Sequence, residues 1–119
     1  MDGQDLPRRA VTAGEFLFRR GDPGDEAYLV VSGEIEILIE AGAGERVLSV
    51  VRRGDIIGEM ALLSHLPRMA GARAKTAATL IAIPAESFQF RLDRLAEQDH
   101  ILRRLLDVYV ERLRLGAGD

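Results

Sequence analysis

The chain has 119 residues, of which 47% are hydrophobic and 29% are charged, and its formal net charge is −3 at pH 7. These values predict one ordinary globular domain spanning residues 1–119, without a broad positive surface for nucleic acid or an anionic membrane. The absence of cysteine excludes disulfides, thiolate metal sites and iron–sulfur clusters, and it agrees with a cytoplasmic location.

The first two thirds of the chain have the pattern of short β-strands. Apolar residues alternate with their neighbours, and glycine turns such as Gly21–Asp25 (GDPGD), Gly33 and Arg52–Asp55 separate the runs. The range Ala41–Glu45 is expected to be a flexible loop. Strands are expected at Phe16–Phe18, Tyr28–Ser32, Ile35–Ile39, Val47–Val51, Ala70–Ala74 and Thr76–Ile83. Such spacing predicts a compact antiparallel sandwich or roll over about residues 8–84.

The pattern changes at Pro84, and two helices are expected over about residues 85–115. Pro84 and Glu86 are typical of a helix N-terminus, and the first helix is expected to reach about Leu95. Asp99 is expected to cap a second helix that runs to about Leu115 and is ended by Gly116 and Gly118.

The last helix has a wide hydrophobic face. At about 100° per residue its apolar positions cover an arc of roughly 200°, whereas packing on one surface needs about 100°. One interpretation is a wide core contact with the preceding helix. The other is two partners, with the roll on one side and a ligand base or a second subunit on the other. The apolar positions are Ile101, Leu102, Leu105, Leu106, Val108, Tyr109, Val110 and Leu113.

The segment Gly58–Ala70, GEMALLSHLPRMA, combines three groups suited to a phosphate-bearing ligand. A helical turn opened by Gly58 leaves backbone N–H groups free to face an anion. Arg68 adds a cationic fork that matches a phosphate. Because the carboxylate of Glu59 would repel a phosphate, it requires a hydroxyl as its partner. A ligand with both groups, such as a sugar phosphate or a nucleotide, satisfies these demands.

The same segment resembles the phosphate-binding cassette of the cyclic nucleotide-binding domain family. It matches every fixed position of the pattern G-E-x-A-L-x-x-x-x-P-R-x-A. Upstream, Gly14–Leu38 is similar to the first half of the family's roll, with glycines at positions 21 and 33, and Gly54-Asp55 leads into the cassette. The resemblance covers about Arg9 to Leu115 and implies an antiparallel, jelly-roll-like β-roll with a short cassette helix and two C-terminal helices.

The resemblance also implies roles for the cassette residues. Arg68 would pair with the cyclic phosphate, although a surface arginine that covers apolar area is the alternative. Glu59 would accept from the ribose 2′-hydroxyl, although an acid at a helix N-terminus is also favoured by the helix dipole. Met69 stands where a hydroxyl would help to hold guanine, so cAMP is expected to bind more tightly than cGMP. The implied ligand-binding residues are Gly58, Glu59, Met60, Ala61, Arg68, Met69 and Ala70.

Small side chains at residues 58, 61 and 70 would let the ligand approach, although tight packing explains Ala61 as well. In the family, an apolar residue at the position of Phe88 packs against the cassette when ligand binds, and a plain core aromatic is the alternative. In the family, a C-terminal helix also caps the base of the nucleotide. The candidates for this capping role here are Leu102, Leu105, Leu106 and Tyr109, with Leu106 or Tyr109 favoured.

The resulting expectation is a regulatory module that binds a cyclic nucleotide, with cAMP expected as the ligand ahead of cGMP. Binding is expected to move the C-terminal helices and so to control a partner domain or protein. No catalytic residue, metal ligand or cofactor is expected, because His65 and His100 are too few and too scattered for a metal-dependent enzyme on a small β-roll. No membrane segment and no nucleic-acid partner are expected for this chain alone. The alternative is a degenerate domain that binds protein without a ligand, or forms a homodimer, through its C-terminal helix.

Overall fold

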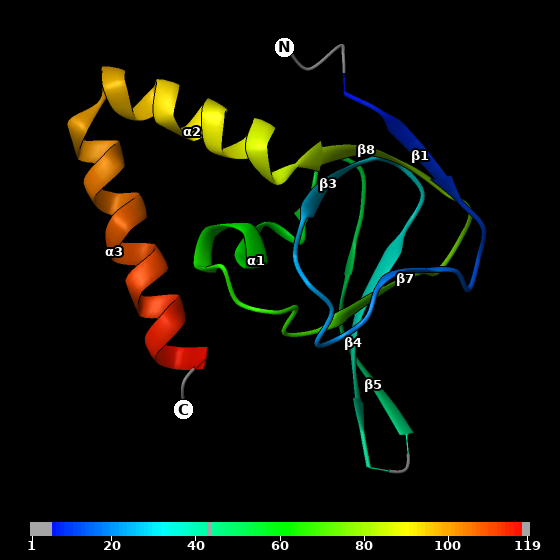
Figure 1. The fold of residues 1–119 in the computed structure, drawn as a ribbon. Coiled ribbons are helices and arrows are strands. Elements are labelled where there is room, and N and C mark those ends of the chain that lie inside the picture. Colours follow the sequence, from blue (N-terminus) through cyan, green and yellow to red (C-terminus); the bar gives the residue numbers. More distant parts are fainter. Residues whose placement is uncertain (1–5, 43, 118–119) are drawn as a thin grey trace.

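The computed structural model describes residues 6–42 and 44–117. Within these ranges, eight strands and the short helix α1 (Glu59–Ser64) form a β-roll from which two further helices extend (Figure 1). One sheet has the order β1-β8-β3-β6 and the other β2-β7-β4-β5, with antiparallel pairing throughout both. The strands are β1 (Arg8–Val11), β2 (Phe16–Phe18), β3 (Glu26–Ser32), β4 (Ile35–Ala41), β5 (Gly44–Val51), β6 (Ile56–Ile57), β7 (Gly71–Ala74) and β8 (Ala78–Pro84).

The core lies between the two sheets and follows from the period of two in the strands. In β8, Ala78, Leu80 and Ala82 are buried at every second position. The largest fully buried side chains are Val30, Ile35, Leu38 and Leu80, from both sheets. The expected class, an antiparallel β-roll with C-terminal helices, is confirmed.

The three helices are α1 (Glu59–Ser64), α2 (Ala85–Gln98) and α3 (His100–Ala117). α2 leaves the roll directly from β8. α3 follows from the far end of α2 and contacts α2 and α1, and α1 lies between α3 and the roll (Figure 1). The carboxylate Oδ1 of Asp99 accepts a hydrogen bond of 3.0 Å from the N–H of Leu102, which confirms Asp99 as the cap of α3.

Several element boundaries differ from the sequence predictions. β1 and β6 were not expected, because β1 buries only Val11 and β6 has two residues. β5 begins at Gly44, inside the expected loop, because it pairs along the whole of β4. α2 continues to Gln98, and α3 continues through Gly116, since glycine weakens a helix without breaking its hydrogen bonds. Gly118 lies outside the described residues.

Candidate functional site

Gly58 opens α1 in a conformation that suits glycine. Its φ is 82°, in the left-handed region, and it is the residue before the first turn of the helix. A Cβ at this position would lie 2.5 Å from Nη1 of Arg68 and 3.3 Å from the carbonyl oxygen of Glu26. The glycine therefore lets the main chain approach the arginine, and the expectation that it begins a helical turn is confirmed.

Arg68 is a buried side chain with only 4% of its surface exposed. Its Nη1 donates a hydrogen bond of 2.8 Å to the carbonyl of Gly58, and its Nη2 donates one of 2.5 Å to the carbonyl of Glu26. Among the described residues, Arg68 has no ion pair, and its buried Nε has no hydrogen-bond acceptor. The alternative of a surface arginine is therefore wrong.

The burial of this cation has an electrostatic consequence. Loss of water around the guanidinium lowers the pKa of Arg68, while the negative charges of Asp25 and Asp22 act in the opposite direction. Neither carboxylate forms an ion pair with it in the described structure. An anion placed directly against Arg68 would offset the desolvation, so the site favours a negatively charged ligand.

The turn between β2 and β3 holds the cassette through the main chain. The N–H of Arg68 donates to the carbonyl of Asp22 over 2.9 Å, and the N–H of Gly21 donates to the carbonyl of Arg68 over 2.8 Å. Asp22 in turn accepts from the N–H of Arg19 through its carboxylate, at 2.9 Å. The turn chemistry of GDPGD thus positions the backbone of the arginine as well as reversing the chain.

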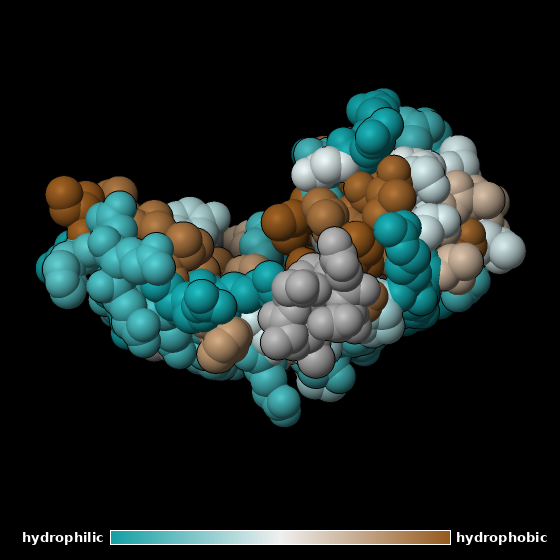
Figure 2. Space-filling view, turned by 90° about the horizontal axis from the view of Figure 1, so that it is seen from above, coloured by the Kyte–Doolittle hydropathy of each residue, from teal (hydrophilic) through white to brown (hydrophobic). Residues whose placement is uncertain are grey.

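A cavity of about 210 Å³ lies beside Arg68. All the residues that were implied as ligand-binding line it, from Gly58 to Ala61 and from Arg68 to Ala70. Its lining also includes residues that the sequence did not single out, namely Phe18, Ile37, Val51, Ile56 and Ile57. Ile56 and Ile57 directly precede the cassette in β6, whereas Phe18, Ile37 and Val51 come from earlier strands that the fold brings to it. The surface is hollowed between the helical part and the roll, with hydrophobic residues along the roll side (Figure 2).

Glu59 and Ala61 illustrate two different functions within α1. Glu59 lines the cavity, and its carboxylate makes no hydrogen bond or ion pair with any described residue. Ala61 is 7% exposed, and a Cβ added to Gly24 would overlap its methyl group. Tight packing therefore explains the small side chain of Ala61, while Glu59 retains its hydrogen-bonding capacity.

The four candidates for capping the base do not line this cavity. Leu105 and Tyr109 are 62% and 49% exposed, and Leu102 is half-buried. Leu106 lines a different cavity, of about 330 Å³, together with Leu63 of α1 and Leu92 of α2. The role of these residues as a cap remains a prediction, and it requires α3 to move toward the cassette.

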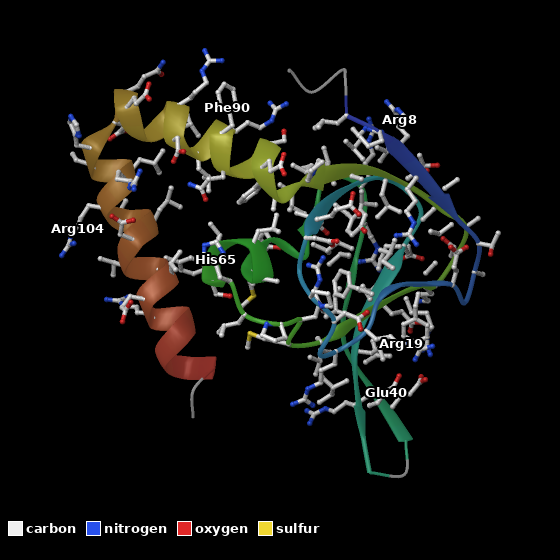
Figure 3. The ribbon with its side chains drawn as sticks, viewed as in Figure 1. Arg8, Arg19, Glu40, His65, Phe90 and Arg104 are labelled. Atoms are coloured by element: carbon white, nitrogen blue, oxygen red, sulfur yellow. The ribbon has the colours of Figure 1, made fainter. Side chains whose placement is uncertain are left out.

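The other helix residues divide between inner and outer faces. Phe88 lines a cavity of about 470 Å³ with Leu62 and His65, and its packing against the cassette when ligand binds remains a prediction. Phe90 of α2 is 54% exposed, and the side chains of Phe90 and Arg104 point away from the roll (Figure 3). Phe90 also belongs to the lining of the cavity beside Phe88, but about half of its side chain is open to solvent.

The profile of the family described as "Cyclic nucleotide-binding domain" matches residues 8–94 of the chain. The chain belongs to the cyclic nucleotide-binding domain family. The matched range includes the whole roll, the cassette and most of α2. The family assignment and the geometry of the cassette therefore agree.

Curated relatives carry this domain within longer proteins. The domain is 45% identical to a cAMP-dependent protein kinase regulatory subunit of Emericella nidulans over 77% of this chain and 21% of the relative. It is 41% identical to an uncharacterized ABC transporter ATP-binding protein of Mycobacterium bovis, over 81% of this chain and 29% of that protein. A Cyclic AMP receptor protein of Thermus thermophilus is 35% identical, with coverages of 83% and 46%. The chain thus spans less than half the length of each of these relatives.

Solved structures show the same fold. An EAL enzyme in its cAMP-bound form superimposes with a TM-score of 0.77 at 28% identity, over 94% of this chain and 30% of that chain. The regulatory domain of Toxoplasma gondii PKA with cAMP gives a TM-score of 0.69 at 34% identity, with coverages of 71% and 32%. Within the described ranges, no helix is long and apolar enough to span a bilayer.

Proposed function

We propose that the domain is a regulatory, non-enzymatic module that binds cAMP in the cavity beside Arg68. The observation that carries this proposal is a buried guanidinium that lacks a carboxylate partner within residues 6–42 and 44–117 and has an unpartnered Nε. A cyclic phosphate supplies both the missing negative charge and an acceptor for Nε. Charge-assisted hydrogen bonds of this kind are worth about 1.5–3 kcal/mol each.

The remaining groups of the cavity suit the rest of a cyclic nucleotide. Glu59 offers a carboxylate that accepts a hydrogen bond from the ribose 2′-hydroxyl, and the absence of a side chain at Gly58 lets the guanidinium of Arg68 lie close to the main chain beside the cavity. Ile37, Val51 and Ile56 provide an apolar surface for a purine. The relatives described as a kinase regulatory subunit and a cyclic AMP receptor protein support the choice of cAMP.

We further propose that binding is transmitted through α1 to α3. α1 begins beside the cavity at Gly58 and reaches α3 through Leu63, which shares its cavity with Leu106 and Val110. A shift at the phosphate end of α1 therefore changes the contact with α3. For cAMP to drive this change, it must bind one arrangement of the helices more tightly than the other. The output is a partner domain or protein that reads the position of α3.

Calorimetric titration tests the binding proposal. We expect the domain to bind cAMP more tightly than adenosine, which lacks the phosphate, and Arg68→Ala to weaken cAMP binding by a few kcal/mol, on the order of the value of a buried charge pair. Arg19→Ala is the matched control, since Arg19 pairs with Glu40 outside the cavity, where the two side chains lie side by side (Figure 3). Equal affinities for the wild-type domain and Arg68→Ala would contradict the assignment of Arg68. No binding of any cyclic nucleotide would favour the protein-binding alternative.

A further inference from the structure

We propose that Phe18 is a positioning residue, whose aromatic ring fixes the guanidinium of Arg68 at the cavity and so sets the affinity for cyclic nucleotide. The carbon Cζ of Arg68 lies 4.1 Å from the centroid of the Phe18 ring. Phe18 also lines the cavity, on strand β2. The effect on affinity rests on the proposed function, whereas the stacking of the two side chains does not.

The ring completes a set of constraints on the guanidinium. Nη1 and Nη2 are tied to the carbonyls of Gly58 and Glu26, and Phe18 lies against the face of the group. The donor left without a partner is Nε, which is buried. A guanidinium that is fixed before the ligand arrives loses little freedom on binding, so the aromatic contact strengthens binding through preorganisation.

Phe18 is itself held by a column of side chains from the opposite sheet. Its ring stacks on that of Tyr28, with centroids 6.4 Å apart and planes inclined by 21°. The hydroxyl of Tyr28 donates to Oε1 of Glu26 over 3.1 Å, and the Cζ of Arg9 lies 5.9 Å from the Tyr28 ring centroid. Glu26 thus holds Tyr28 through its carboxylate and Arg68 through its carbonyl. The stacked ring of Tyr28, itself held by Glu26 and Arg9, therefore restrains the ring of Phe18.

The same strand offers a matched control. Phe16 also has a cation over its ring, with Cζ of Arg19 at 3.7 Å and Cζ of Arg73 at 5.6 Å. Phe16 is not among the residues that line the cassette cavity. A change at Phe16 therefore perturbs an aromatic contact of the same kind on β2 without touching the site.

The test replaces each phenylalanine separately by leucine and by 4-fluoro- and 3,4,5-trifluorophenylalanine in the full chain. Fluorine withdraws electron density from the ring face while nearly preserving its shape, so these variants fold even where Phe18→Leu does not. Affinity for cAMP is measured by calorimetry. The Nε–H resonance of Arg68, identified by its loss in Arg68→Lys, is followed by NMR to report how well the guanidinium is ordered.

At residue 18, we expect affinity to fall stepwise with fluorination and about tenfold in Phe18→Leu, which corresponds to about 1.4 kcal/mol. The Nε–H of Arg68 should exchange faster with water in the same order. Substitutions at residue 16 should change neither quantity. Unchanged affinity and exchange at residue 18, or equal effects at both positions, would overturn the proposal. If the wild-type domain binds no cyclic nucleotide, the proposed function fails, and the Nε–H exchange alone decides whether Phe18 positions Arg68.

Discussion

Gly24 packs against the methyl group of Ala61 with no room for a side chain at residue 24. Gly24 belongs to the turn between β2 and β3, whereas Ala61 is buried in α1. This contact fixes the cassette helix against the turn that also carries the main-chain hydrogen bonds to Arg68. The position of the cassette therefore depends on a glycine about forty residues earlier in the chain, rather than on α1 alone.

We predict that Gly24→Ala lowers the free energy of unfolding by about 1–3 kcal/mol, because the new methyl group overlaps that of Ala61. Ala61→Gly in the same chain should restore part of this loss by making room, although glycine inside a helix itself costs about 1 kcal/mol. Urea unfolding of both single variants and the double variant gives the coupling. Strictly additive effects would show that the two residues do not compete for the same space.

Base preference provides a second prediction. Met69 lines the cavity and is 48% exposed, and it offers guanine no hydroxyl. We expect cAMP to bind more tightly than cGMP, and Met69→Thr to narrow the difference by about 0.5–1.5 kcal/mol through one new hydrogen bond. Competition binding measures the ratio, with Leu48→Thr as a control that should leave it unchanged, since Leu48 is exposed and does not line the cavity. A wild-type domain that prefers cGMP would show that this interpretation of Met69 is wrong.

The proposed movement of α3 predicts a change in hydrogen exchange. Leu105 and Tyr109 are about half exposed or more, whereas Leu106 and Val110 line a cavity that α3 shares with Leu63 of α1. Addition of cAMP should slow amide exchange across His100–Ala117, because a helix that closes over the base opens less often. Adenosine, and cAMP added to Arg68→Ala, should have no such effect. Protection confined to Gly58–Ala70 would show that α3 is no lid, and its exposed apolar residues would then indicate a partner surface.

Tyr28 predicts a loss of stability in alkaline solution. Burial, reinforced by the nearby carboxylate of Glu26, raises the pKa of Tyr28 above its ordinary value of 10.0. The unfolded chain therefore releases this proton at a lower pH than the folded domain, and the free energy of unfolding falls as the pH rises from 10.0 through the raised pKa. Urea unfolding at about pH 8 and about pH 11 should show a smaller decline in Tyr28→Phe than in the wild-type domain. Identical declines would contradict this assignment.

The features that were predictable from the sequence are those set by neighbouring residues. The helical turn opened by Gly58, the cap at Asp99 and the alternation in β8 each depend on a few adjacent positions. The cassette could be recognised because its functional residues lie within one continuous segment. All of its implied ligand-binding residues do line a common cavity.

The features that were missed depend on contacts between distant segments. β1 has little apolar pattern of its own and becomes a strand by pairing with β8. Phe18 reaches Arg68 only because β2 pairs with β7, which directly follows the cassette. The face that α3 presents to α1 is likewise set by the turn after Gln98, and no pattern within α3 specifies it. Packing of this kind cannot be read from periodicity.

The pairing of β8 with both β1 and β3 also has a consequence for synthesis of the chain on the ribosome. β1 finds its only partner strand within the described structure in β8, and β3 pairs with β8 along most of its length. Residues 8–77 therefore emerge before the strand that joins them, and the first sheet cannot close until Pro84 has been made. Pairing across such a separation is slow because the loop must be closed first. A nascent chain stalled before β8 would therefore expose its apolar strands to chaperones and proteases.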